Sequence, residues 1–280
     1  MTKKRILGGL LAASALFLAA CGGTDTTAGN SDEPIEVTVG VVREVNEVWD
    51  YVSEQLLEHE NIDITLQKFT EYNIPNTSLA DGTIDLNSFQ TEIFLDEFNE
   101  AAGEDLTVIG YTVMAPLGIY SAEVTDLADI GEGSEIAIPN DPSNGGRALR
   151  LLQTAGLLTV DPEAGLLPTV DDITENPLNL TITELDSSQT ARALEDLTAS
   201  VINSGMAVDA GFVPTEDAVF LEPVTEDSKP YYNVIASRPD ETDNEVYKTI
   251  VEYYQTEETK EVIEETSAGS SIPVWDSVAE

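Results

Sequence analysis

The stretch from Ile136 to Leu152 holds the side chains best suited to binding a small molecule. It reads IAIPNDPSNGGRALRLL, in which a strand ends at Pro139, a turn rich in Asn, Asp, Pro and Ser follows, and a helix begins near Ser143. The start of such a helix offers unpaired backbone N–H groups and the positive end of the helix dipole. Arg147 lies in its early turns, and a guanidinium matches a carboxylate bidentately. The pattern therefore predicts a carboxylate-binding site.

A structural ion pair is the alternative role for Arg147, because the chain has 53 acidic residues against 12 basic ones. Asp141 is expected to cap the helix or shape the turn rather than to bind a ligand.

Enzymatic catalysis has little support in the sequence. The chain has one cysteine and one histidine, which excludes Cys/His zinc sites and Cys–His nucleophile pairs. His59 ends an acidic helix and is expected at the surface, and carboxylate pairs are too abundant to indicate a glycosidase. There is no P-loop, no GxGxxG after a strand and no GxSxG. We therefore expect no enzymatic activity, no cofactor and no transition metal, while a weak calcium site stays open.

Alternating strands and helices must position these residues. Apolar periodicity predicts strands over 35–42, 62–66, 108–110, 135–139, 180–184, 199–202 and 232–237. It predicts helices over 46–59, 76–80, 92–102, 146–155, 188–194 and 244–265. This βαβ order indicates parallel sheets covered by helices, with ligands at the carboxyl ends of the strands. About 245 residues exceed one comfortable sheet, so we expect two α/β lobes with a ligand cleft between them.

The charge of the chain excludes some partners. A formal net charge of −41 repels phosphate backbones and anionic head groups, so nucleic-acid binding is excluded. Such acidity suits saline or alkaline surroundings outside a cell.

The N-terminus has the pattern of a lipoprotein leader. Basic residues at positions 3–5 precede an apolar run of fifteen residues, Ile6 to Ala20, which is too short to cross a bilayer. The run ends in LAACGG, which resembles the bacterial lipobox, so we expect residues 1–20 to be a signal peptide and Cys21 to be lipidated. Residues 21–34 lack large apolar side chains and are expected to be a flexible tether.

Several segments resemble the NlpA/MetQ family of methionine-binding lipoproteins, the substrate-capturing components of ABC importers. Between residues 35 and 275, in the order of the family, they are FTEYNIPN (69–76), DGTIDLNSFQ (81–90), PNDPSNGGRAL (139–149), ENP (175–177), ASVIN (199–203), YYN (231–233) and GSSIPVW (269–275). The resemblance implies a periplasmic-binding-protein fold that closes on a free amino acid. One lobe would comprise residues 35–117 plus 232–280, and the other residues 118–231.

The resemblance also assigns ligand contacts. Arg147 would pair with the ligand carboxylate, Asn144, Asn203 and Asn233 would fix the α-amino and carboxylate groups, and Tyr72 and Phe89 would surround the thioether. Amide groups supply donors and acceptors for a zwitterion, and thioethers favour aromatic edges. The asparagines could instead serve turns or backbone, and the aromatics could belong to the core. Trp49 and Trp275 are expected to be packing anchors, while Arg43, Glu44 and Asn46 could line the cleft.

Two departures from the family bear on the ligand. The family commonly has FQH where this chain has Phe89-Gln90-Thr91, so Thr91 is expected to be the ligand-binding residue at the position of the histidine that reaches the pocket. The family also has an aromatic residue where this chain has Ala115 before Pro116. Both changes remove bulk, so the pocket would be larger than methionine requires if both positions face the cleft. The ligand could then be a methionine-containing dipeptide, an oxidised methionine or another apolar amino acid.

The sequence thus predicts a lipid-anchored, extracytoplasmic and monomeric solute-binding protein that delivers methionine or a relative to an ABC permease with its ATPase. Its attachment to the cell membrane would be through the Cys21 lipid only. The rival interpretations are an enzyme on the same scaffold, a surface lipoprotein whose cleft is vestigial, and a metal-uptake protein.

Overall fold

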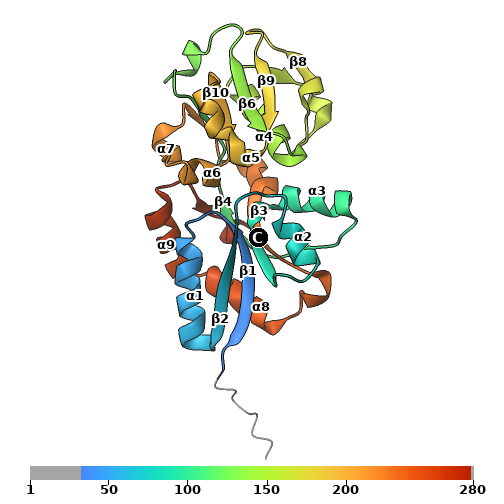
Figure 1. Ribbon diagram of the computed structural model, residues 1–280, viewed down its shortest axis with the longest axis vertical. Coiled ribbons are helices and arrows are strands. Elements are labelled where there is room, and N and C mark those ends of the chain that lie inside the picture. Colours follow the sequence, from blue (N-terminus) through green and yellow to red (C-terminus); the bar gives the residue numbers. More distant parts are fainter. Residues whose placement is uncertain (1–32, 279–280) are drawn as a thin grey trace, which may run out of the picture. The chain divides into compact units, whose positions relative to one another are not determined.

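The computed structural model describes residues 33–278. The predicted signal peptide, Cys21 and the tether up to residue 32 lie outside the described residues. The described part contains two larger β-sheets and one two-stranded sheet, with helices between the strands (Figure 1).

The first large sheet has six strands in the order β13-β4-β12-β3-β1-β2. Its pairings β1–β2 and β1–β3 are parallel, and the pairings of β12 with β3 and β4 and of β13 with β4 are antiparallel. The strands are β1 (Ile35–Val42), β2 (Ile62–Phe69), β3 (Leu86–Thr91), β4 (Thr107–Met114), β12 (Tyr232–Ser237) and β13 (Ile272–Pro273).

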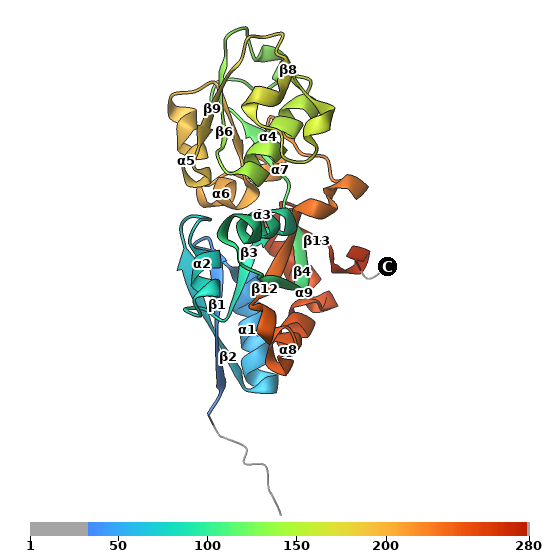
Figure 2. The same ribbon diagram turned by 90° about the vertical axis from the view of Figure 1, so that its right-hand side faces the viewer.

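Helices cover both faces of this sheet (Figures 1 and 2). One face packs against α1 (Glu47–Glu60), α8 (Glu245–Tyr254) and α9 (Glu257–Ser267), through a core that includes Val39, Leu56, Ile250, Ile263 and Trp275. On the other face lie α2 (Pro75–Ala80) and α3 (Glu92–Ala102), with Leu79 and Leu95 buried.

The second large sheet has five strands in the order β11-β5-β10-β6-β9. The pairs β10–β6 and β6–β9 are parallel, whereas β5 runs antiparallel to β10 and β11. Its strands are β5 (Gly118–Tyr120), β6 (Glu135–Pro139), β9 (Thr181–Leu185), β10 (Ala199–Ile202) and β11 (Phe220–Leu221). The helices between them are α4 (Pro142–Thr154), α5 (Ser187–Thr190), α6 (Ser204–Asp209) and α7 (Pro214–Asp217). The two-stranded sheet pairs β7 (Thr159–Val160) with β8 (Ile173–Glu175).

The α/β prediction is confirmed, but three predicted features were wrong, and β3 and several shorter strands were not predicted. Both large sheets are mixed rather than parallel. The helix predicted over 244–265 is two helices, because Gln255 leaves the helical region and Thr256 caps α9 by accepting from the Thr259 N–H. The helix predicted over 188–194 is the short α5 followed by a 3₁₀ turn, Arg192–Glu195.

Packing residues also lie as expected. Trp49 and Trp275 are buried in the core of the first sheet, and the Trp49 ring packs at a tilt against Tyr254, with the ring centroids 5.1 Å apart. His59 is exposed in the last turn of α1. The described residues contain no helix that is both long and apolar enough to cross a membrane.

Candidate functional site

A cavity of about 190 Å³ lies between elements of the two large sheets. Its lining includes the end of β1, the β3–α3 junction, the start of α4 and the β10–α6 junction. All seven residues predicted to bind the ligand line this one cavity: Tyr72, Phe89, Thr91, Asn144, Arg147, Asn203 and Asn233. Arg43 and Asn46 also line it, whereas Glu44 is not among the lining residues.

Two glycines allow α4 to begin close to its neighbours. A Cβ atom on Gly145 would lie 2.8 Å from the Pro139 carbonyl oxygen, and one on Gly146 would lie 2.9 Å from the Leu167 Cα. Because both obstacles are backbone atoms, only glycine fits at these positions. The close approach places Asn144 and Arg147, in the first turns of α4, at the cavity.

Asp141 caps α4, as expected. Its carboxylate accepts hydrogen bonds from the Asn144 backbone N–H at 2.9 Å and from the Ser143 hydroxyl at 3.0 Å. Burial raises the pKa of Asp141, and these hydrogen bonds act in the opposite direction. The ionised carboxylate can only accept hydrogen bonds, which fixes the direction of the contacts that follow.

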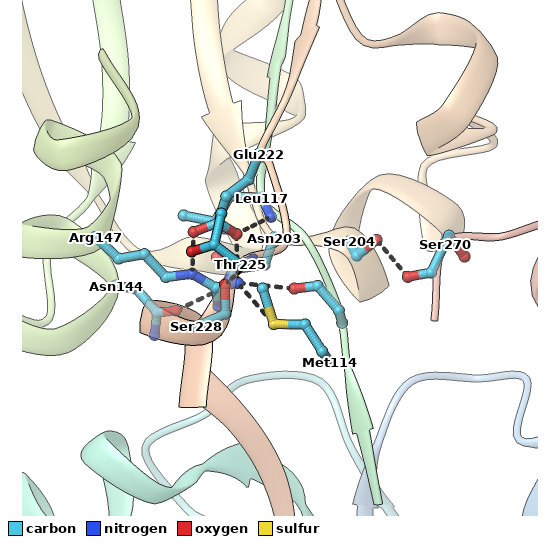
Figure 3. A network of polar contacts seen from close by, with 11 residues as sticks. Met114, Leu117, Asn144, Arg147, Asn203, Ser204, Glu222, Thr225, Ser228 and Ser270 are labelled. Atoms are coloured by element: carbon cyan, nitrogen blue, oxygen red, sulfur yellow. Dashed lines mark hydrogen bonds and ion pairs between the residues drawn. The ribbon is translucent and has the colours of Figure 1, made fainter. Parts of the chain in front are cut away.

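Asp141, Asn144 and Asn203 form a directed chain of hydrogen bonds. The Asn144 amide donates to both Asp141 oxygens, at 2.9 and 3.1 Å. Its own oxygen therefore accepts, at 2.7 Å, from the Asn203 amide (Figure 3). The last atom of the chain, Asn203 Oδ1, is buried and has no hydrogen-bond partner among the described residues. The chain of hydrogen bonds thus ends in an unpaired acceptor on a residue that lines the cavity, and such an acceptor suits an ammonium group.

Arg147 forms an internal ion pair with Glu222. Its Nε and Nη2 donate to the two Glu222 carboxylate oxygens at 3.0 and 2.5 Å, and Nη2 also donates to the Ala115 carbonyl at 3.0 Å (Figure 3). The Tyr231 ring lies 4.5 Å from the guanidinium carbon. The hydrogen bonds to oxygen that Arg147 makes within residues 33–278 all come from Nε and Nη2, and none comes from Nη1. The alternative of a structural ion pair is thus realised, yet one edge of the guanidinium stays free.

Three aromatic side chains form another part of the lining. The ring centroids of Tyr72, Phe89 and Phe94 lie 5.9 to 6.1 Å apart, mostly edge to face. Burial raises the pKa of Tyr72 well above its usual value, so its hydroxyl is neutral. An apolar side chain with a polarisable sulfur would make favourable contacts with these rings.

The two positions that depart from the family both line the cavity, namely Thr91 and Ala115. Thr91 lies opposite Asn233 in the β3–β12 pairing and caps α3 by accepting from the Phe94 N–H at 3.4 Å. The condition for an enlarged pocket, that both positions face the cavity, is therefore met.

Arg43 has a strained backbone, and its side chain extends toward the elements of the second sheet. Its φ of 129° is in a region that side chains other than glycine rarely adopt. Its side chain reaches Gly205, where a Cβ would lie 3.0 Å from Arg43 Cδ, and its Nε lies 3.9 Å from Asp209 Oδ1 in α6. Burial raises the pKa of Asp209, an effect that the Arg43 charge opposes.

Sequence reasoning missed three features of this site. Glu222 lies 75 residues from Arg147 and belongs to no motif that we identified. Phe94 was assigned only to a helix. The third is a buried amide cluster in which Asn76 and Gln90 exchange hydrogen bonds of 2.6 and 2.7 Å and Asn87 joins at 2.8 Å. This cluster fixes Gln90 between Phe89 and Thr91 at the cavity.

A metal centre has no support in the described part of the chain, where no three His, Cys, Asp or Glu side chains are grouped to hold an ion.

Comparison with known proteins identifies the family. The family model for the NlpA lipoprotein matches residues 37–275. The chain belongs to the NlpA lipoprotein family. The D-methionine-binding lipoprotein MetQ of Escherichia coli strain K12 is 37% identical over 243 residues, which cover 86% of this chain and 88% of that protein.

Solved structures of this family share the fold. A nutrient-binding protein from Burkholderia cenocepacia, solved bound to methionine, has a TM-score of 0.81 and 39% identity over 85% of this chain and 99% of that one. The substrate-binding protein of a methionine transporter from Streptococcus pneumoniae has a TM-score of 0.81 and 38% identity, covering 86% and 96%. These matches confirm the predicted two-lobed fold of the family.

Proposed function

We propose that this protein is the solute-binding component of an ABC importer and that it captures methionine or a closely related amino acid. The observation that carries the proposal is the meeting of three chemistries in one cavity: a guanidinium edge, a free amide acceptor and an aromatic cluster. The names of the relatives, which mention methionine binding and methionine transport, support the same ligand class.

The lining suggests how the ligand is held. The free Nη1 of Arg147 would bind the ligand carboxylate, and Asn203 Oδ1 would accept from the ammonium group. Tyr72, Phe89 and Phe94 would enclose the side chain. Asn144 orients Asn203, while Asn233 and Thr91 complete the lining. This set binds and orients a ligand and includes no nucleophile with a paired base, so we propose a role in binding rather than catalysis.

Capture would involve closure of the two lobes, residues 35–117 plus 232–280 and residues 118–231. Closure removes water from the Arg147–carboxylate contact and strengthens it, while polar partners offset the cost of desolvation. We further propose cleavage of residues 1–20, lipidation of Cys21, a tether over residues 21–34 and a monomer on the extracytoplasmic side of the cell membrane. The loaded protein would deliver its ligand to a permease with its ATPase.

Calorimetric titration with L-methionine and D-methionine tests the proposal. We expect saturable binding of at least one enantiomer and a loss of about a hundredfold or more in Arg147→Ala, since a buried charged contact is worth several kcal/mol. Arg150→Ala is the matched control, because Arg150 lies in the same helix, donates to the Gly165 carbonyl and is not among the lining residues of the cavity. Unchanged binding in Arg147→Ala would contradict the proposal.

A longer ligand, such as a methionine-containing dipeptide, is the second candidate. It is favoured by Thr91 and Ala115, which both line the cavity with small side chains. A thermal-shift panel of methionine, its sulfoxide, methionine-containing dipeptides and other apolar amino acids distinguishes the two. A clear preference for methionine would reject the longer ligand.

A non-transport surface lipoprotein is the remaining alternative, favoured by the internal pairing of Arg147 with Glu222. Native mass spectrometry of freshly purified protein tests it. Bound amino acid or peptide supports transport, whereas a protein that binds no member of the panel supports the vestigial cleft.

A further inference from the structure

Both arginines that line the cavity already have an acidic partner. Arg147 holds Glu222 through two hydrogen bonds, and Arg43 lies 3.9 Å from Asp209. Among the described residues, the only other charged group of the lining is the exposed Glu47. The cavity therefore has no excess positive charge to offer an anion.

Glu222 is held in place and cannot leave Arg147 easily. Its side chain is 12% exposed and that of Arg147 is 3% exposed. Glu222 Oε2 also accepts from the Leu117 backbone N–H at 3.0 Å, in the segment that joins β4 to β5 (Figure 3). Because three donors on two segments hold the carboxylate, a ligand meets the neutral pair rather than a lone guanidinium.

The charge of the pair affects which ligands fit. A carboxylate that binds at Nη1 is attracted by Arg147 and repelled by Glu222 across the same guanidinium. A zwitterion offsets this repulsion with its own ammonium group, whereas a carboxylic acid without an amine adds an unbalanced negative charge to a poorly solvated site. Like charges brought together in such a site repel each other and weaken binding.

We propose that Glu222 is a specificity-determining residue that makes the cavity select ligands of zero net charge over carboxylic acids that lack the amino group. The inference rests on the proposed function, because it takes Arg147 as the carboxylate-binding residue. The role belongs to Glu222 rather than to the acidity of the whole chain, since distant exposed charges are screened by salt whereas this pair is mostly shielded from solvent.

Two probes that differ only in the amine test the proposal. L-methionine is a zwitterion, and 4-(methylthio)butanoate has the same thioether and carboxylate with a net charge of −1. The measured quantity is the ratio of their dissociation constants in each protein, from calorimetry or ligand competition. We expect Glu222→Gln to lower the preference for L-methionine by about tenfold, which corresponds to about 1.4 kcal/mol.

Two further variants separate charge from structure. Glu222→Asp keeps the carboxylate and should keep most of the wild-type preference. Glu226→Gln removes one negative charge from an exposed residue nearby, for which no ion pair is found among the described residues, and should leave the ratio unchanged. The ratio is taken within one sample, so a partly folded variant does not bias it.

An equal change in affinity for both probes in Glu222→Gln would overturn the proposal and leave the proposed function standing. Should Glu222→Gln fail to fold, the wild-type protein still tests the proposal. Equal affinity of the wild type for the two probes would also overturn the proposal. A wild-type protein that binds neither methionine enantiomer would instead contradict the proposed function.

Discussion

At the scale of single residues, the backbone of Arg43 stores strain at the edge of the cavity. A φ of 129° costs a side chain other than glycine about 1 to 3 kcal/mol. Arg43→Gly removes both the side chain and the strain, whereas Arg43→Ala removes only the side chain. Glycine loses more conformational entropy on folding, which offsets part of the gain. We expect Arg43→Gly to be more stable than Arg43→Ala by about 1 kcal/mol, measured by chemical denaturation.

The two Arg43 variants serve as controls for each other, because both remove the contact with Asp209 and differ only in the backbone. A Gly variant less stable than the Ala variant would show that no strain is relieved at this position.

The sequence predicted which residues line the cavity but not the acidic partner of Arg147. The motif residues, such as Arg147 and Asn203, could be predicted because helix starts and strand ends place them at one edge. Glu222 could not, because one acid among 53 has no local signal and its partner is set by tertiary packing. Because Glu222 occupies Nε and Nη2, Nη1 of Arg147 is left free. The sequence could not predict this either.

At the scale of elements, the cap residue of α4 also sets the direction of the hydrogen bonds that link Asp141, Asn144 and Asn203. Asp141→Asn keeps a good cap residue but can donate as well as accept, so Asn144 and Asn203 lose their fixed orientation. We expect affinity for the amino-acid ligand to fall about tenfold in Asp141→Asn with little loss of stability. Asp141→Ala also removes the cap and should cost about 1 kcal/mol of stability.

The same carboxylate predicts a pH dependence. Because burial raises the pKa of Asp141, its contribution to stability is full at low pH and is lost as pH rises through the folded-state pKa. Ligand affinity has the opposite trend, since protonated Asp141 can donate and the chain of hydrogen bonds loses its direction. We expect wild-type affinity to fall as pH drops toward that pKa, which lies above 3.8, and Asp141→Asn to lack this component. Titrations of both proteins across the acid range compare them, and parallel pH profiles would contradict the role of Asp141.

Elements with strong apolar periodicity were predicted well, as the match of β1 and of α3 to the expected ranges shows. β3 was missed because it reads LNSFQT, and its buried side chains include Asn87 and Gln90, which are paired with Asn76 rather than with apolar neighbours. The long C-terminal helix was predicted as one because no Gly or Pro marks the break at Gln255 and Thr256. Tertiary pairing of the amides explains the first case, and the local cap by Thr256 marks the second.

At the scale of the whole molecule, the net charge of −41 predicts a salt-dependent stability. Self-repulsion destabilises a compact chain, and its range shrinks from about 30 Å at 0.01 M salt to about 3 Å at 1 M. We therefore expect Tm to rise by several degrees between these concentrations of NaCl.

A variant with Glu261→Gln, Glu264→Gln and Glu265→Gln, all exposed in α9, should have a higher Tm at low salt and gain less from added salt. Equal gains in Tm for the variant and wild type would point to general salting-out rather than screening. Affinity for a zwitterion should depend far less on salt than Tm does, because such a ligand carries no net charge for the field of the molecule to repel.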